Sequence, residues 1–146
     1  MNLFDLMDVS GSALLAERAR AEVVTSNLAN SETTRTPEGG PYRRQEVVFR
    51  SAPAHHANFA ETLSSLADMH VHGVEVDQVV ADKSDPIRRF DPTHPDADKQ
   101  GYVSYPNINP ITEMVDLMGA ARGYQLNIAA VQATKGMIKT ALTILA

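Results

Sequence analysis

The stretch ITEMVDLMGAARGYQLNIAAVQATKGMIKTALTIL, residues 111–145, decides the fold. Uncharged residues recur through it at alternating steps of four and three, which is the spacing of a coiled-coil-like seam on a long helix. The seam positions are Leu117, Ala121, Tyr124, Ile128, Val131, Lys135, Ile138, Leu142 and Leu145, with Lys135 as the single charged member. Asn109 or Thr112 can cap this helix, and Glu113 and Asp116 fall in its first turns, where the helix dipole favours acids.

The other end of the chain has the same character. Residues 3–28 carry apolar side chains at mainly helical steps of three, four and seven: Leu3, Met7, Leu14, Ala21, Val24 and Leu28, with Leu6, Leu15 and Ala29 widening the stripe. Ser10-Gly11-Ser12 is a weak point, because glycine costs about 1 kcal/mol in a helix interior. The helix either starts at Ser12 or tolerates a joint there. Asn27, Asn30 and Ser31 are stop signals.

The middle of the chain is different. All eight prolines lie outside residues 3–28 and 111–145, and proline breaks helix interiors. We expect strands at Tyr42–Phe49, Val71–Val80 and Ile87–Phe90, a helical turn or loop at Phe59–Met69, and an extended connector at 91–110. In the second strand, Val74, Val76 and Val80 would face a small core.

The predicted fold class is therefore α+β. An antiparallel, coiled-coil-like pair of long N- and C-terminal helices is joined by a small, irregular β-containing central region. The predicted division is 1–32 for the N-terminal helix, 33–110 for the central loop and β region, and 111–146 for the C-terminal helix.

Composition excludes several classes of function. The net charge is −5 and the pI is near 5.4, whereas a nucleic-acid-binding protein needs a basic stripe. There is no cysteine, so disulfides, thiolate nucleophiles and cysteine–metal sites are excluded. We see no cleavable signal peptide and no apolar run that could span a membrane, so export would use a route without a cleaved peptide and no direct membrane insertion is expected.

No catalytic, cofactor-binding or metal site is predicted. His70 and His72 on a strand, with His55, His56 and His94, allow a zinc site to be imagined, but no metal-binding signature accompanies them. Asp91, Asp96 and Asp98 resemble oxygen ligands for Ca²⁺, yet the EF-hand spacing is missing, and such residues are ordinary turn formers. We predict turns.

The functional residues are instead expected on the two helices, because two helices alone cannot cover stripes this wide. The predicted helix-packing and interface residues are Leu3, Met7, Leu14, Leu15, Val24, Leu28, Met114, Val115, Met118, Tyr124, Ile128, Val131, Ile138, Leu142 and Leu145.

Several motifs carry a family resemblance. Ser10-Gly11-Ser12-Ala13-Leu14 with Ser26-Asn27-Leu28-Ala29-Asn30 resembles the N-terminal signature of the bacterial flagellar rod and hook proteins, and Tyr124-Gln125-Leu126-Asn127 resembles their C-terminal helix. The central segments 32–44, 90–98 and 101–107 are similar to those of a proximal-rod subunit. Gly123 departs from the wider family, which usually has alanine or serine there.

This resemblance implies a structural role and no catalytic residues. Subunits of this family stack helically into the rod of the flagellar basal body, a drive shaft that crosses the periplasm. Their terminal helices line an export channel, and they leave the cytoplasm through the flagellar type III export apparatus. The expected partners are copies of the chain, other rod proteins and the export apparatus. The alternatives are another axial subunit of the same rod or, from a different class, a small metal-dependent hydrolase using His70, His72, His94 and nearby aspartates.

Overall fold

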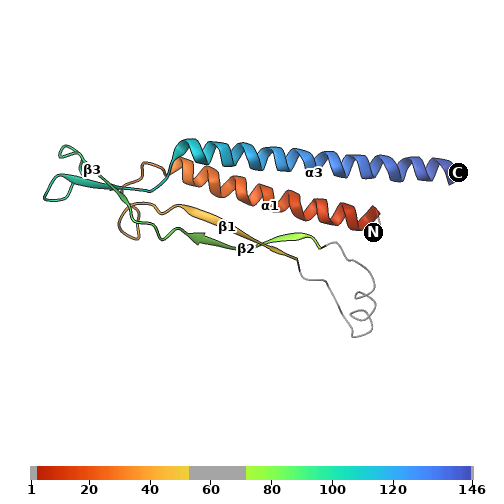
Figure 1. Cartoon of the computed structure of the whole chain (residues 1–146), viewed down its shortest axis with the longest axis horizontal. Coiled ribbons are helices and arrows are strands. Elements are labelled where there is room, and N and C mark those ends of the chain that lie inside the picture. Colours follow the sequence, from red (N-terminus) through yellow and green to blue (C-terminus); the bar gives the residue numbers. More distant parts are fainter. Residues whose placement is uncertain (1–2, 53–71, 146) are drawn as a thin grey trace, which may run out of the picture.

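The computed structural model describes residues 3–52 and 72–145, and it is built around two long antiparallel helices (Figure 1). Helix α1 spans Leu3–Ala29 and helix α3 spans Pro110–Leu145. At about 1.5 Å per residue, α3 is roughly 13 Å longer than α1, and its C-terminal end extends past the start of α1 (Figure 1). The α+β class predicted from the sequence is confirmed.

The sequence left undecided where the first helix starts and which residue caps the second. Helix α1 is already helical at Leu3 and runs without interruption through Gly11, so neither the start at Ser12 nor the joint there is found. Helix α3 is capped by Asn109, whose side-chain oxygen accepts a hydrogen bond from the Ile111 amide at 3.0 Å. Pro110 occupies the first helical position, where its missing N–H costs nothing.

Two short antiparallel ribbons make up the described β structure. Strand β1, Gln45–Ser51, pairs with β2, Val74–Ala81, and a bulge lies between Val48 and Phe49. Strand β3, Ile87–Phe90, pairs with β4, Tyr102–Tyr105. The β1–β2 ribbon runs alongside α1, whereas β3 lies at the end of the molecule opposite to both termini (Figure 1).

The structure corrects the prediction for residues 91–110. That segment is not only a connector, because it contains β4, whose Tyr102 pairs with Phe90 of β3. The two rings pack edge to face with centroids 5.4 Å apart. Strand β4 is only four residues long and is bounded by Gly101 and Pro106, so its alternation is too short to stand out from the turn signals around it.

The apolar core is small. The buried hydrophobic side chains are Ala16, Val24 and Ala120 in the helix pair and Val103 and Ile108 near the start of α3. Val76 and Val80, predicted to face a core, remain 37% and 36% exposed. A two-stranded ribbon has no second layer of its own to cover it, which explains this difference. The predicted element at Phe59–Met69 lies outside the described residues.

The β1–β2 ribbon is attached to α1 through Ser12. The Ser12 hydroxyl donates to the Val9 carbonyl at 2.8 Å and accepts from the Val74 amide at 3.0 Å. Gly73 makes this approach possible, because a Cβ at Gly73 would lie 2.6 Å from Ser12 Oγ and 3.2 Å from Ser12 Cβ. The Ser-Gly-Ser segment is thus an attachment point for the ribbon.

We predict that Gly73→Ala detaches the ribbon from α1, because the new methyl group displaces the Ser12 hydroxyl. The measurement is amide hydrogen exchange, which should become faster at Val74 and stay unchanged in the second half of α1. Gly119→Ala is the matched control, since a Cβ there meets nothing within 4 Å. Unchanged protection at Val74 in Gly73→Ala contradicts the prediction.

The β3–β4 turn is expected to be acid-sensitive through Asp98. Hydrogen bonds from the backbone amides of Tyr102 and Gln100 and the nearby Arg88 guanidinium outweigh desolvation and lower the pKa of Asp98. A carboxyl with a lowered folded-state pKa stabilises the fold above its unfolded pKa of about 3.9, and this stabilisation is lost as the pH falls through the folded pKa. We therefore expect the NMR chemical shift of the Tyr102 amide to change as the pH falls below about 4. Asp98→Asn should lack this transition.

Candidate functional site

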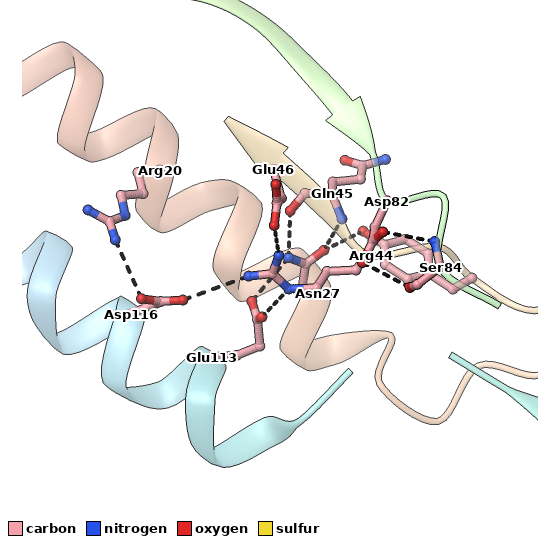
Figure 2. Close-up of polar contacts among 10 residues, drawn as sticks. Arg20, Asn27, Arg44, Gln45, Glu46, Asp82, Ser84, Glu113 and Asp116 are labelled. Carbon is pink, nitrogen blue, oxygen red and sulfur yellow. Dashed lines mark hydrogen bonds and ion pairs between the residues drawn. The ribbon is translucent and has the colours of Figure 1, made fainter. Parts of the chain in front are cut away.

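A polar cluster with two fully buried members, Asn27 and Glu113, joins α1, β1 and α3, and Asn27 lies at its centre (Figure 2). The Asn27 amide donates to the Gln45 carbonyl at 2.8 Å and to Glu113 Oε2 at 3.1 Å. Its oxygen accepts from the Gln45 amide at 2.9 Å and from the Tyr42 hydroxyl at 3.2 Å. Every donor and acceptor of this side chain is therefore used, and the end of α1 is fixed to both the first strand and the second helix.

Glu113 is the buried charged residue of the cluster, and it is 1% exposed. Its Oε1 accepts from Arg44 Nε at 2.6 Å. Burial acts to lower the pKa of Arg44, but the hydrogen bond to Glu113 and the charges of Glu113 and Glu46 outweigh it and raise that pKa above its ordinary value. The buried carboxylate therefore has a permanently charged partner, which a carboxylate in this position requires.

The ion pairs continue outward along the helices. Arg44 also contacts Glu46 and lies 3.7 Å from Asp116, and Arg20 reaches Asp116 at 3.4 Å (Figure 2). We refer to Asn27, Arg44, Gln45, Glu113 and Asp116 as the polar clasp. It lies at the end of the helix pair where the chain enters α3.

Beyond the clasp, the most deeply buried side chains of α1 and α3 are small. The buried side chains of the two helices beyond the clasp are Ser10, Ala16, Val24, Ala120 and Thr134. On α3, the buried positions Glu113, Ala120 and Thr134 recur every seven or fourteen residues. This line is rotated from the apolar seam at Leu117, Tyr124 and Ile128, so the side of α3 that packs on α1 is narrower and more polar than the sequence pattern indicates.

The predicted interface residues fall into three groups. Val24 is buried, and several are half-buried, namely Met7, Leu14, Leu28, Ile128, Val131 and Ile138. The others with described side chains are exposed: Leu3, Leu15, Met114, Val115, Met118, Tyr124 and Leu142. The side chain of Leu145 lies outside the description. The role of the predicted interface residues in packing between subunits stays a prediction.

A second apolar stripe runs along the far side of α3. Ile111, Val115, Met118 and Leu126 are 55–71% exposed. At about 100° per residue, they lie roughly 120–180° around the helix from Ala120, which faces α1. Helix α3 therefore has apolar side chains on both sides, a pattern typical of helices that are buried all round.

An open groove of about 500 Å³ separates α1 and α3 on one side of their contact. Ala21, Ala120 and Tyr124 line it, together with Glu17. The Glu17 carboxylate lies against Gly123, where a Cβ would come within 2.9 Å of Glu17 Oε1. Glu17 Oε2 is buried and has no hydrogen-bond partner among the described residues.

Neither the histidines nor the aspartates form a metal site in the described part of the chain. No group of three or more metal-ligating side chains is assembled in residues 3–52 and 72–145. His55, His56 and His70 lie outside these ranges. Asp91 and Asp98 accept hydrogen bonds from residues two to four positions later, at Thr93, Gln100 and Tyr102, which is the turn-forming role predicted for them. None of the described helices is long and apolar enough to cross a bilayer.

The clasp was missed by the sequence reasoning. The sequence pattern indicates a helix stop at Asn27 and an acid favoured by the helix dipole at Glu113, and it includes Arg44 only as the last residue of the family segment 32–44. Asn27 in fact lies inside α1 and faces the core. The signal that could have identified Asn27 is its spacing, because it follows Val24 by three positions and therefore lies on the same side of the helix.

We predict that Asn27→Ala lowers the free energy of unfolding by about 3 kcal/mol, because it leaves the buried Gln45 backbone groups and one Glu113 oxygen without a partner. Urea unfolding followed by far-UV circular dichroism measures the change. Gln132→Ala, at an exposed position of α3, is the control and should change stability by less than about 0.5 kcal/mol. Equal free energies of unfolding for the two variants would contradict the proposed contribution of the clasp to stability.

Comparison with known proteins gives two family matches. Residues 7–35 match the model of the flagella basal body rod protein. Residues 99–144 match the C-terminal model of the flagellar basal body rod proteins FlgE, FlgF and FlgG. The two matches cover α1 and α3, the elements that the clasp joins.

Curated relatives match over nearly the whole chain. The flagellar basal-body rod protein FlgC of Bacillus subtilis (strain 168) is 43% identical over 148 residues, with 99% of each chain covered. The FlgC proteins of Borreliella burgdorferi and Salmonella typhimurium are 39% and 36% identical, with 99% of this chain and 99% and 98% of theirs covered. The resemblance stated from the motifs is confirmed, and the chain belongs to the FlgC family of flagellar basal-body rod proteins.

Proposed function

We propose that this chain is a structural subunit of the proximal rod of the bacterial flagellar basal body. It assembles helically through α1 and α3 with copies of itself and with other rod proteins. The assembled rod transmits torque and encloses an export channel. In this role the chain carries out no chemical step.

The observation that carries the proposal is the exposed apolar stripe on the far side of α3. Ile111, Val115, Met118 and Leu126 are more than half exposed, although α1 already covers the opposite side of the helix. Burying apolar surface is worth about 25 cal/mol per Å². Neighbouring helices that cover this stripe therefore supply a driving force for assembly that the single chain cannot realise.

The small core supports the same role. Five hydrophobic side chains are buried in the described chain, and two helices of this length draw most of their stability from packing. A subunit that unfolds readily suits passage through a narrow export apparatus, and we propose that it reaches the rod by that route. Contacts with neighbours would then complete the packing of α1 and α3 after transit.

The geometry of the subunit also suits a filament. The two faces of α3 differ, since one packs on α1 and the other is exposed and apolar. A contact between unlike surfaces of identical subunits extends into a helical filament when its rotation does not close a ring. The family relationship supports this interpretation, because the relatives named above are basal-body rod proteins.

We predict that the double variant Val115→Glu, Met118→Glu abolishes incorporation into the rod without unfolding the subunit, because both side chains are more than half exposed in the single chain. The measurement is the amount of this chain in purified basal bodies, together with swimming motility. Gln132→Glu, which adds one negative charge at an exposed position of α3 beyond the last residue of this stripe, should assemble normally.

Two results are needed to interpret this experiment. The monomer's helical circular dichroism should match that of the unsubstituted protein, which separates assembly from folding. Basal bodies that contain the double variant at normal levels would overturn the proposal that this stripe is an assembly surface.

A further inference from the structure

We propose that the groove between α1 and α3 receives the far side of α3 from a second copy of this chain, with Arg122 of that copy pairing with Glu17. The inference rests on the proposed function and names its contact. It starts from Glu17, an acid in a groove that Ala21, Ala120, Ala121 and Tyr124 also line, with Arg18 and Gln125 as its other polar residues.

Glu17 has no hydrogen-bond or ion-pair partner among the residues that the structure describes. Its Oε2 is buried and receives no hydrogen bond from the described residues. The arginines near it on α1 are engaged elsewhere, since Arg18 bonds to Glu22 at 2.9 Å and Arg20 reaches Asp116. A buried carboxylate oxygen without a donor is costly, so a cation supplied from outside the chain would stabilise it.

Arg122 is the complementary feature. It is exposed, makes no ion pair with the described residues, and lies on the same side of α3 as the apolar stripe. Met118 precedes it by one turn and Leu126 follows it by one turn, and both are more than half exposed. The stripe therefore consists of apolar side chains with one guanidinium between them, and guanidinium groups match carboxylates in geometry.

The charge pair would fix the register of the two surfaces. When Arg122 of one copy reaches Glu17 of another, Met118 and Leu126 lie one turn to either side of it along the groove. Glu17 and Arg122 of one chain lie at the same position along the helix axis, because Gly123, next to Arg122, faces Glu17. They do not meet within the chain, because Arg122 lies on the side of α3 that faces away from α1. The contact must therefore be between copies.

This geometry also sets the arrangement of neighbouring copies. The groove and the stripe lie on different sides of α3, so the contact joins unlike surfaces and continues from copy to copy. Because Glu17 and Arg122 are at the same height in each chain, parallel neighbours would be displaced along the helix axis by no more than the reach of an arginine side chain.

Gly123 has a defined place in this contact. It leaves the space that the Glu17 carboxylate occupies at the helix crossing. A methyl group at this position would force the carboxylate to move and would alter the acceptor that Arg122 meets. Gly119, one turn earlier on α3, has open space instead and offers a matched comparison.

The test uses site-specific cross-linking in assembled basal bodies, which the absence of native cysteine makes selective. Cells co-express two variants, Ala21→Cys at the groove and Arg122→Cys on the stripe, and purified basal bodies are treated with a short bismaleimide. We expect a cross-linked dimer only when both variants are present. Lys135→Cys and Lys139→Cys, which place the thiol further along α3, replace Arg122→Cys as controls and should yield at least about tenfold less dimer.

A charge exchange tests the ion pair itself. Arg122→Glu and Glu17→Lys should each lower the amount of this chain in basal bodies, by about tenfold or more. The double variant should recover much of it. Gly123→Ala should lower incorporation while Gly119→Ala does not.

The outcomes separate the inference from the proposed function. If the chain is present in basal bodies but the dimer is absent, equally strong with the lysine controls, or replaced by a cross-link to a different protein, the groove–stripe contact is wrong and the rod role stands. If the chain is absent from basal bodies altogether, the proposed function itself fails.

Discussion

The structure depends on one buried carboxylate. Glu113 is held at the entrance of α3 by Arg44 from the segment before β1 and by Asn27 from α1. Removing such a charge from water is unfavourable unless each oxygen is hydrogen-bonded, and here both are. These directional bonds align α1, β1 and α3 at one end, so the register of the helix pair is set by polar geometry as well as by apolar packing.

This arrangement leaves the apolar side chains free for another use. Between the clasp and the free ends, α1 and α3 approach through Ala16, Ala120 and other small residues. Small residues let the helices come close and bury little area. The large side chains of α3, such as Met118 and Leu126, remain outside. The subunit has a defined shape together with an exposed apolar surface, which is the combination that a filament-forming subunit needs.

The two helices, their antiparallel pairing and most of the strands were predictable from the sequence, because period, proline placement and capping residues are local signals. The family was predictable too, since short motifs such as Ser26–Asn30 carry it. The candidate site was predictable only in outline. Strand β4 was missed because Tyr102–Tyr105 is too short to show a period, and β1 and β2 begin three residues later than predicted.

By itself, the sequence determined that α3 is long, apolar and interrupted by no proline, and that its stripe exceeds what one partner helix can cover. Only the tertiary structure decided which side of α3 faces α1. That choice depends on Asn27 and Glu113, which lie 86 residues apart and have no common local signal. The side of α3 that is buried is the one on which polar side chains keep their hydrogen bonds. Those bonds form only once distant segments of the chain are brought together.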